Sequence, residues 1–103
     1  MIRHVVHLRF PTDFSTDDKM ALYAELDALR HHIPGVEDFQ HRSNVSPETP
    51  VVRGFLDLFW FDFADAASRD IYLEDPQHKA VGAKLVASLD GGIDGLFVCD
   101  FEL

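Results

Sequence analysis

The 103-residue sequence contains a single cysteine and no apolar run long enough to cross a membrane. Because Cys99 has no second cysteine to pair with, it cannot form an internal disulfide, and nothing points to an oxidising compartment. A membrane-spanning helix needs roughly 18 or more apolar residues in succession. Residues 1–10 mix His and Arg with apolar side chains, which is unlike a secretory signal. We therefore expect a cytoplasmic protein.

Basic residues are few as well, with 9 Lys and Arg against 18 Asp and Glu and a net charge of −9. No basic cluster interrupts the acids, so the phosphates of a nucleic acid and an anionic membrane surface would both be repelled. The sequence also lacks a glycine-rich phosphate-binding loop and a G-x-S-x-G nucleophile motif. These absences argue against nucleic-acid and membrane partners.

Apolar residues are plentiful: they make up 47% of the chain and include nine phenylalanines. This length and composition suffice for one modest core, so we expect a single domain spanning residues 1–103. Alternating polar and apolar side chains over Ile2–Phe10 predict a first strand with His4 on its drier face. Leucine and isoleucine at intervals of three and four then predict a helix that is capped by Ser15 and ends at a Pro-Gly pair.

A second helix is expected from its N-cap, Asp65, to about Glu74. Pro76 interrupts it, since proline lacks an N–H, but Asp75 as N-cap and Pro76 as first residue favour an immediate restart. Further strands are predicted at Val36–Ser43, Gly54–Phe63 and Leu96–Leu103. The order β-α-β-β-α-β is typical of the ferredoxin-like α+β fold, in which both helices cover one face of a four-stranded antiparallel sheet.

The predicted strand Gly54–Phe63 is apolar on both faces. One face combines Asp57 with four phenylalanines, and the other carries Leu58 and Trp60. Because a small domain covers only one face of its sheet with its own helices, we expect the second face to pack against another copy of the chain. The sequence therefore predicts a homodimer.

Five segments occur in order along nearly the whole chain: IRHVVHLRF, IPGV, NVSPE, YLEDPQH and VCDFE. Together they resemble the stress-responsive A/B barrel family, abbreviated Dabb. The resemblance implies a dimeric α/β barrel in which two ferredoxin-like sheets pack face to face with the helices outside. Many members of the family have no assigned reaction, and some plant members are stress-induced stable proteins. One branch contains polyketide cyclases, which close a ring by intramolecular aldol condensation.

The resemblance also implies a pocket between the sheet and the helices. In the cyclase branch this pocket uses the tyrosine and histidine of the Y…P-x-H turn and a histidine of the first strand, which correspond here to Tyr72, His78 and His4. Two positions depart from the branch. Asp75 stands where the family often has a second histidine, and Asp57 stands where the cyclases place another pocket histidine.

The residues themselves point to the same region. His78 is three residues before Val81 and seven before Leu85, so it lies on the apolar stripe of the restarted helix and should face the sheet. Burying His4, Asp57 and His78 without partners would cost about 1–3 kcal/mol each. An imidazole beside a carboxylate suits general-base catalysis, and the Tyr72 phenol could donate a proton to an enolate. We therefore expect His78, Tyr72, His4 and Asp57 as catalytic residues for proton abstraction next to a carbonyl.

Structural roles explain the same residues. A core histidine is commonly hydrogen-bonded to a carbonyl or carboxylate, Tyr72 could be an aromatic wedge, and Asp57 could pair with His4 or His78. The three ionisable side chains could also form a two-histidine, one-carboxylate metal set, but no H-x-x-x-H spacing supports it, and we expect neither metal nor cofactor. The alternative function is a non-catalytic stress-response dimer. A cavity of a few hundred Å³ lined by these four residues would favour a small, largely apolar or aromatic ligand instead.

Overall fold

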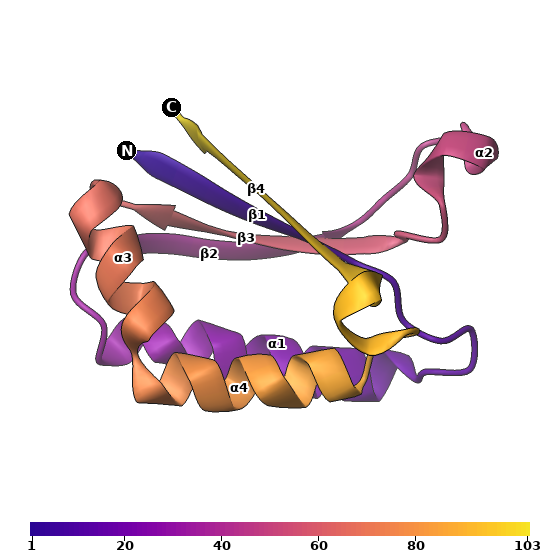
Figure 1. Cartoon of the computed structure of the whole chain (residues 1–103), viewed down its shortest axis with the longest axis horizontal. Coiled ribbons are helices and arrows are strands. Elements are labelled where there is room, and N and C mark those ends of the chain that lie inside the picture. The colour runs from indigo at the N-terminus through magenta and orange to yellow at the C-terminus, as the bar shows by residue number, and fades with distance from the viewer.

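One layer of the molecule is a four-stranded antiparallel sheet, and the other consists of the three longer helices, which all cover the same face of that sheet (Figure 1). The computed structural model describes all residues, 1–103. The strands are β1 Ile2–Leu8, β2 Val36–Ser43, β3 Asp57–Phe63 and β4 Leu96–Glu102. They lie in the order β2-β3-β1-β4, so β1 and β3 are central and β2 and β4 form the edges.

The longer helices are α1 Thr16–Ala28, α3 Ala66–Glu74 and α4 Pro76–Ala87. The structure also has three short helical elements: the 3₁₀ helices η1 Leu29–His31 and η2 Gly92–Gly95, and the one-turn α-helix α2 Thr49–Val52. None of the helices has the length and apolarity that crossing a membrane requires. The predicted ferredoxin-like βαββαβ fold is confirmed.

Side-chain caps start each of the longer helices, as the sequence predicts. Ser15 Oγ accepts a hydrogen bond from the Asp18 N–H at 3.1 Å. Asp65 accepts one from the Ser68 N–H at 2.8 Å. Asp75 accepts one from the N–H of His78 at 2.9 Å, so the restart of the helix at Pro76 is confirmed.

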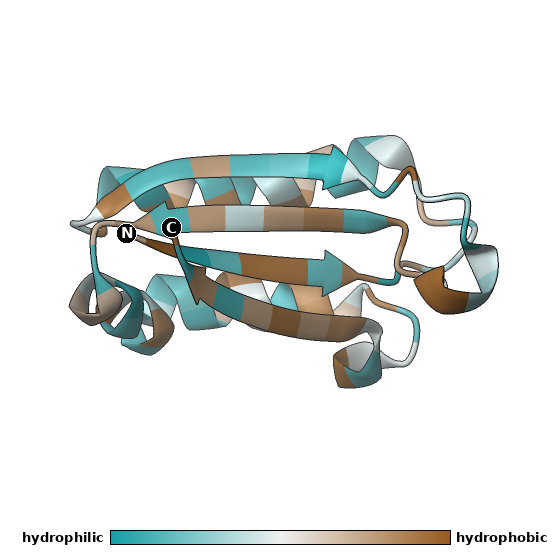
Figure 2. Cartoon of the chain, turned by 90° about the horizontal axis from the view of Figure 1, so that it is seen from above, coloured by the Kyte–Doolittle hydropathy of each residue, from teal (hydrophilic) through white to brown (hydrophobic).

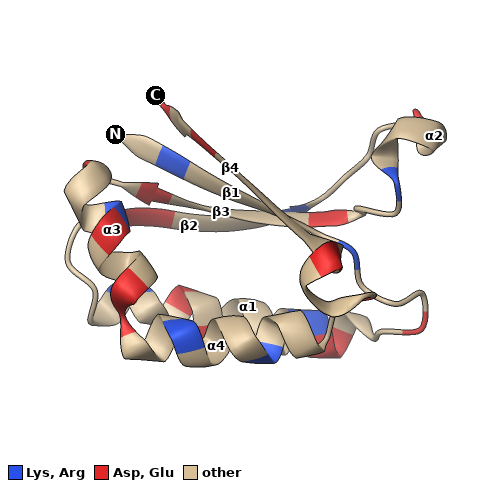
Figure 3. Cartoon of the chain, viewed as in Figure 1, with Lys and Arg blue, Asp and Glu red and all other residues tan.

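The core lies between the helices and the inner face of the sheet, meaning the face that the helices cover. The predicted helical stripe is buried there: Leu22, Leu26, Leu29 and Ile33. Opposite this stripe lie three buried phenylalanines of β3: Phe59, Phe61 and Phe63. Figure 2 shows the opposite, outer face, where β2 is mostly hydrophilic and β4 carries a long hydrophobic stretch. The acidic and basic residues are distributed over both layers without a basic cluster (Figure 3).

The third strand is shorter than predicted, because it begins at Asp57 and not at Gly54. Arg53 and Gly54 both have left-handed backbone conformations, with φ of 57° and 79°, which turn the chain before the strand starts. Phe55 therefore leaves the inner face, and its ring lies 6.3 Å from that of Phe97 on the outer side. The segment before it, expected to be a plain loop, contains α2, which stands away from the sheet on the outer side (Figure 1).

Candidate functional site

A cavity of about 310 Å³ opens between the inner face of the sheet and helices α3 and α4. Nine of its 13 lining residues are hydrophobic, and they come from β1, β3, β4, α1, α3 and α4. The side chains of His4, Tyr72 and His78 line it together. Of the four residues expected to line one cavity, His4, Tyr72 and His78 do so and Asp57 does not. Few polar groups converge on an otherwise apolar lining.

The break between α3 and α4 brings two of these side chains into contact. Tyr72 lies in the last turn of α3 and His78 in the first turn of α4, on either side of Asp75 and Pro76. Their ring centroids are 3.9 Å apart, with an interplanar angle of 36°. Because the Asp75 cap holds the His78 backbone, the turn that stops one helix also places the imidazole against the phenol.

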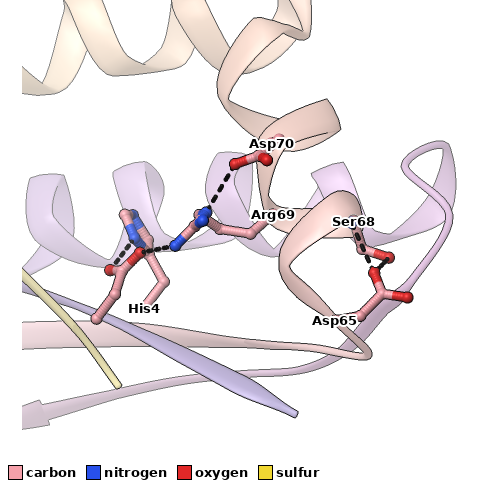
Figure 4. A network of polar contacts seen from close by, with 6 residues as sticks. His4, Asp65, Ser68, Arg69 and Asp70 are labelled. Carbon is pink, nitrogen blue, oxygen red and sulfur yellow. Dashed lines mark hydrogen bonds and ion pairs between the residues drawn. The ribbon is translucent and has the colours of Figure 1, made fainter. Parts of the chain in front are cut away.

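His4 joins them from the middle of β1. Its ring packs edge-on against Tyr72, with centroids 5.8 Å apart, and only 5% of the residue is exposed. Its Nδ1 lies 2.7 Å from Oδ1 of Asp100, which is directly opposite on β4. Oδ2 of Asp100 in turn accepts a hydrogen bond from Arg69 Nη1 at 2.8 Å, and Arg69 also contacts Asp70 (Figure 4).

Comparison with known proteins identifies the family of the chain. The family described as the stress-responsive A/B barrel domain, Dabb, matches residues 2–103. The chain belongs to the Dabb family. No curated protein matches the chain.

Solved structures share the fold of this Dabb chain. A dimeric ferredoxin-like protein of unknown function from Jannaschia sp. CCS1 is 33% identical, with 99% of this chain and 98% of that chain covered and a TM-score of 0.85. A protein from Arabidopsis thaliana is 21% identical, with 100% and 95% covered and a TM-score of 0.88. A hydroxynitrile lyase from Passiflora edulis is 14% identical, with 99% and 92% covered and a TM-score of 0.81. At such identities the last two show the fold alone.

The environment of the candidate site favours uncharged side chains. Burial lowers the pKa of His4, and the neighbouring Asp100 carboxylate opposes that effect only in part. Burial also lowers the pKa of His78, assisted by the nearby His4, and burial raises the pKa of Tyr72. At neutral pH the cavity therefore presents two neutral imidazoles that can accept a proton and one phenol that can donate one.

Asp57 is not part of this group. It is buried at the other end of β3, opposite Leu8, whereas His4 is opposite Phe61. Its carboxylate binds Lys19 Nζ at 3.0 Å and lines a separate, smaller cavity of about 190 Å³. The expected pairing of Asp57 with His4 or His78 is therefore wrong. Strand alternation predicts the face of a side chain correctly but says nothing of the distance along the strands.

Two polar residues of the site were missed from the sequence, namely Asp100 and Arg69. Asp100 shares its face of β4 with Leu96 and Val98, and an acid that follows two apolar residues on one face of a strand was a usable signal. Its pairing with His4 depends on the register of β4 against β1, which no local pattern predicts. Arg69 lies in α3 with a half-buried side chain, and a charged residue in a helix is ordinary from the sequence alone.

The largest cavity, of about 450 Å³, lies elsewhere. It is enclosed by the segment around α2 and the outer face of the sheet, where His7 stacks on Phe97 with centroids 4.6 Å apart. That face is the one expected to meet a second copy. The inner cavity is the better candidate site, because only there do several buried ionisable groups converge.

Proposed function

We propose that this Dabb protein binds a small, largely apolar carbonyl compound in the inner cavity, where His4, Tyr72 and His78 perform acid–base chemistry. The supporting observation is the cavity itself, about 310 Å³ and apolar, with three ionisable side chains converging on it. This volume is at the lower end of the range of about 300–1,000 Å³ that is usual for ligand pockets. A neutral ligand fits best, because none of those three side chains is charged at neutral pH. The fourth ionisable lining residue, Lys79, is 59% exposed and pairs with Glu74.

The proposed reaction needs no cofactor. An imidazole nitrogen takes a proton from the carbon next to the carbonyl, and the C–H electron pair forms the C=C bond of an enolate. The carbonyl oxygen takes up the negative charge and is stabilised by the Tyr72 hydroxyl. In a cyclase-like reaction the enolate carbon then attacks a second carbonyl of the same molecule, and the resulting alkoxide recovers the proton from the imidazolium.

We also propose that the protein forms a homodimer through the outer face of the sheet. Two observations support it: Phe97 and Phe101 of β4 are 52% and 44% exposed on that face, and the relative from Jannaschia is described as dimeric. Exposed aromatic side chains on an otherwise packed sheet are typical of protein interfaces. Sedimentation velocity should give a dimer at micromolar concentration. A clean monomer would contradict this proposal.

The ligand proposal is tested with neutral ketones. A thermal-shift screen of small aromatic and aliphatic ketones should raise the melting temperature of the wild-type protein. The aromatic ketone phenylacetone then serves as a probe of proton abstraction, because exchange of its CH₂ protons in D₂O is followed by proton NMR.

His78→Ala should slow the exchange and weaken the thermal shift, since it removes the imidazole that faces Tyr72 and part of the cavity lining. His31→Ala is the matched control, because His31 is exposed and does not line the cavity. If no ketone stabilises the protein and all three proteins give the same exchange rate, the alternative is right: a non-catalytic stress-response dimer with structural histidines.

A further inference from the structure

His4 is held by charged side chains from two other elements, and neither of them lines the cavity. Asp100 comes from β4 and Arg69 from α3, and the two oxygens of Asp100 are divided between His4 and Arg69, at 2.7 Å and 2.8 Å. Figure 4 shows this chain of contacts running from the helix to the histidine. The proposed reaction as stated above uses neither Asp100 nor Arg69.

We propose that Asp100 and Arg69 are positioning residues that fix His4 in the tautomer with hydrogen on Nδ1, so that its Nε2 is the base of the site. The proposal rests on the proposed acid–base function and names the atom that takes the proton. It also divides the work between the two histidines, since it assigns the base to His4 and leaves His78 beside the Tyr72 phenol.

The tautomer follows from the donors and acceptors. An ionised carboxylate only accepts hydrogen bonds, so the short contact to Asp100 requires the hydrogen of His4 to be on Nδ1. A neutral imidazole carries one such hydrogen, and Nε2 is therefore left with a free lone pair. Because His4 lines the cavity, Nε2 is the nitrogen that remains for a ligand.

The two histidines differ in this respect. His78 Nδ1 is buried without a hydrogen-bond partner, and although the Leu73 backbone raises the pKa of His78, no carboxylate is hydrogen-bonded to its ring. The orientation of the His4 ring, by contrast, is fixed by Asp100 on one side and by edge-on packing against Phe63 and Tyr72. A general base must be held in a defined direction and protonation state, and His4, whose Nδ1 contacts a carboxylate, meets that condition better than His78.

Arg69 completes the arrangement because a guanidinium only donates hydrogen bonds. It occupies the second oxygen of Asp100, whose side chain is 24% exposed at the edge strand and would otherwise be free to turn towards water. The charged and titratable groups that face His4 are thus Asp100, Arg69, Tyr72 and His78. Asp100 raises the pKa of His4 and Arg69 lowers it, while burial lowers it most.

The Asp100→Asn substitution should invert the tautomer. The side-chain amide has one accepting oxygen and one donating nitrogen, and Arg69 can bind only the oxygen. The amide nitrogen then faces His4 Nδ1, which must become an acceptor, and the hydrogen moves to Nε2. A substitution that hardly changes the size of the side chain would thereby turn the proposed base into a donor.

The test uses full-length protein with ¹⁵N-labelled histidine and long-range ¹H–¹⁵N correlation spectra, with the His4 signals assigned by His4→Gln. We expect the Nδ1–H tautomer in the wild type and the Nε2–H tautomer in Asp100→Asn. Asp70→Asn is the matched control, because Asp70 also contacts Arg69 but not His4, and it should keep the wild-type tautomer. Adding Arg69→Met to Asp100→Asn frees the amide to turn, so the Nδ1–H tautomer should return.

The pKa of His4, measured by titration, gives a second readout, because the two substitutions should shift it in opposite directions. Asp100→Asn should lower the pKa of His4, and Arg69→Met alone should raise it. General-base catalysis contributes about 10²–10⁴-fold, so phenylacetone exchange should slow at least about tenfold in Asp100→Asn while the ketone still raises the melting temperature.

A wild-type His4 with hydrogen on Nε2, or an unchanged tautomer in Asp100→Asn, would overturn the positioning role. If the tautomers behave as expected but the wild type promotes no exchange, the proposed reaction falls and the arrangement of His4 stands. Isosteric Asp100→Asn should remain folded by circular dichroism. If it does not, Arg69→Met tests the same series of contacts from Arg69, which binds Asp100 and does not contact His4.

Discussion

His4 and Asp57 are both buried polar side chains on the inner face of the sheet, yet their surroundings differ. Around Asp57 the charges are matched: Lys19 binds the carboxylate, and Arg9 and Asp90 in the same small cavity pair with each other. Around His4 the cavity is larger and mostly apolar, and the neighbouring His78 keeps a buried nitrogen without a partner. Both ends of the face contain a buried polar atom without a partner, namely the Tyr23 hydroxyl near Asp57 and His78 Nδ1 near His4. Only beside His4 does the residue with the unpartnered atom line the same cavity as the buried ionisable side chain.

This difference bears on how a function is inferred from buried polar residues. A polar group in a core must be paired to offset its desolvation, and a fully paired group is a complete structural feature. A site for a ligand needs in addition an unpaired atom next to free volume. The end around His4 has both, which is why Asp57 does not enter the proposed function although its burial is similar.

The largest effect is expected from Tyr72, whose ring fills the space between the two histidines and is 1% exposed. Tyr72→Ala should lower the free energy of unfolding by about 3–5 kcal/mol, because a large aromatic side chain leaves a cavity. Tyr72→Phe keeps the ring and should cost less than about 1 kcal/mol. Urea denaturation measures both. If both variants cost the same, the neighbouring side chains must move into the space that the Tyr72 ring leaves. The lining of the inner cavity would then not be rigid.

At the other end, Asp57→Ala should destabilise the protein by about 1–3 kcal/mol, since it leaves the Lys19 amine without its partner. It should leave ketone-induced thermal shifts unchanged. Asp90→Ala is the control: its side chain is 63% exposed, and such a pair is worth less than about 1 kcal/mol. Loss of ketone binding in Asp57→Ala would remove the distinction between the two ends.

Stability should also depend on pH through the end around His4. Burial lowers the pKa of His4 and of His78 from the ordinary value of 6.5, so below this pH the unfolded state binds more protons than the folded state. The stabilisation is complete above pH 6.5 and is lost as the pH falls through the folded-state pKa values. Each histidine contributes at most about 1.4 kcal/mol per pH unit.

Urea midpoints between about pH 5 and pH 8 measure this slope. The double variant His4→Gln/His78→Gln should flatten it, and the exposed His31→Gln should not. An identical slope in the wild type and the double variant would show that neither imidazole is held neutral by burial.

The smallest effect is expected at Gly82, which lies in the middle of α4 and lines the cavity. A substitution there should change stability and binding in opposite directions. A Cβ there would lie 4.0 Å from His78 Nε2, an ordinary contact. Gly82→Ala should therefore stabilise the helix by about 0.5–1 kcal/mol and weaken ketone binding by narrowing the cavity. Ala83→Gly, on the exposed side, should lower stability and leave binding unchanged. Stronger binding in Gly82→Ala would place the ligand elsewhere.

Local features of the fold were predictable from the sequence. Hydrophobic periodicity gave the order of the elements, and capping chemistry gave the starts of the helices at Ser15, Asp65 and Asp75. The direction of His78 followed from the same reasoning, because the position of a side chain on a helix is fixed once the first residue is known. These are properties of short segments, which residues a few positions apart decide.

Non-local features were not predictable in this way. Asp57 was expected beside a histidine, but its position along β3 puts Lys19 within reach instead. Asp100 meets His4 across 96 residues of sequence, through a strand register that depends on the packing of the whole sheet. The backbone turn at Arg53 that removes Phe55 from the inner face was likewise invisible, since a left-handed conformation is uncommon for arginine.

The only tryptophan of the chain, Trp60, lies on the outer face, with the guanidinium groups of Arg3 and Arg42 5.1 Å and 5.4 Å from its ring centroid. The inner cavity, between the sheet and helices α3 and α4, is on the other side of the same sheet. The protein thus contains a natural fluorophore that is separated from the proposed binding site by the sheet and located on the proposed interface between subunits. A change in Trp60 emission on dilution, with none on addition of a ketone, would distinguish assembly from binding in a single sample.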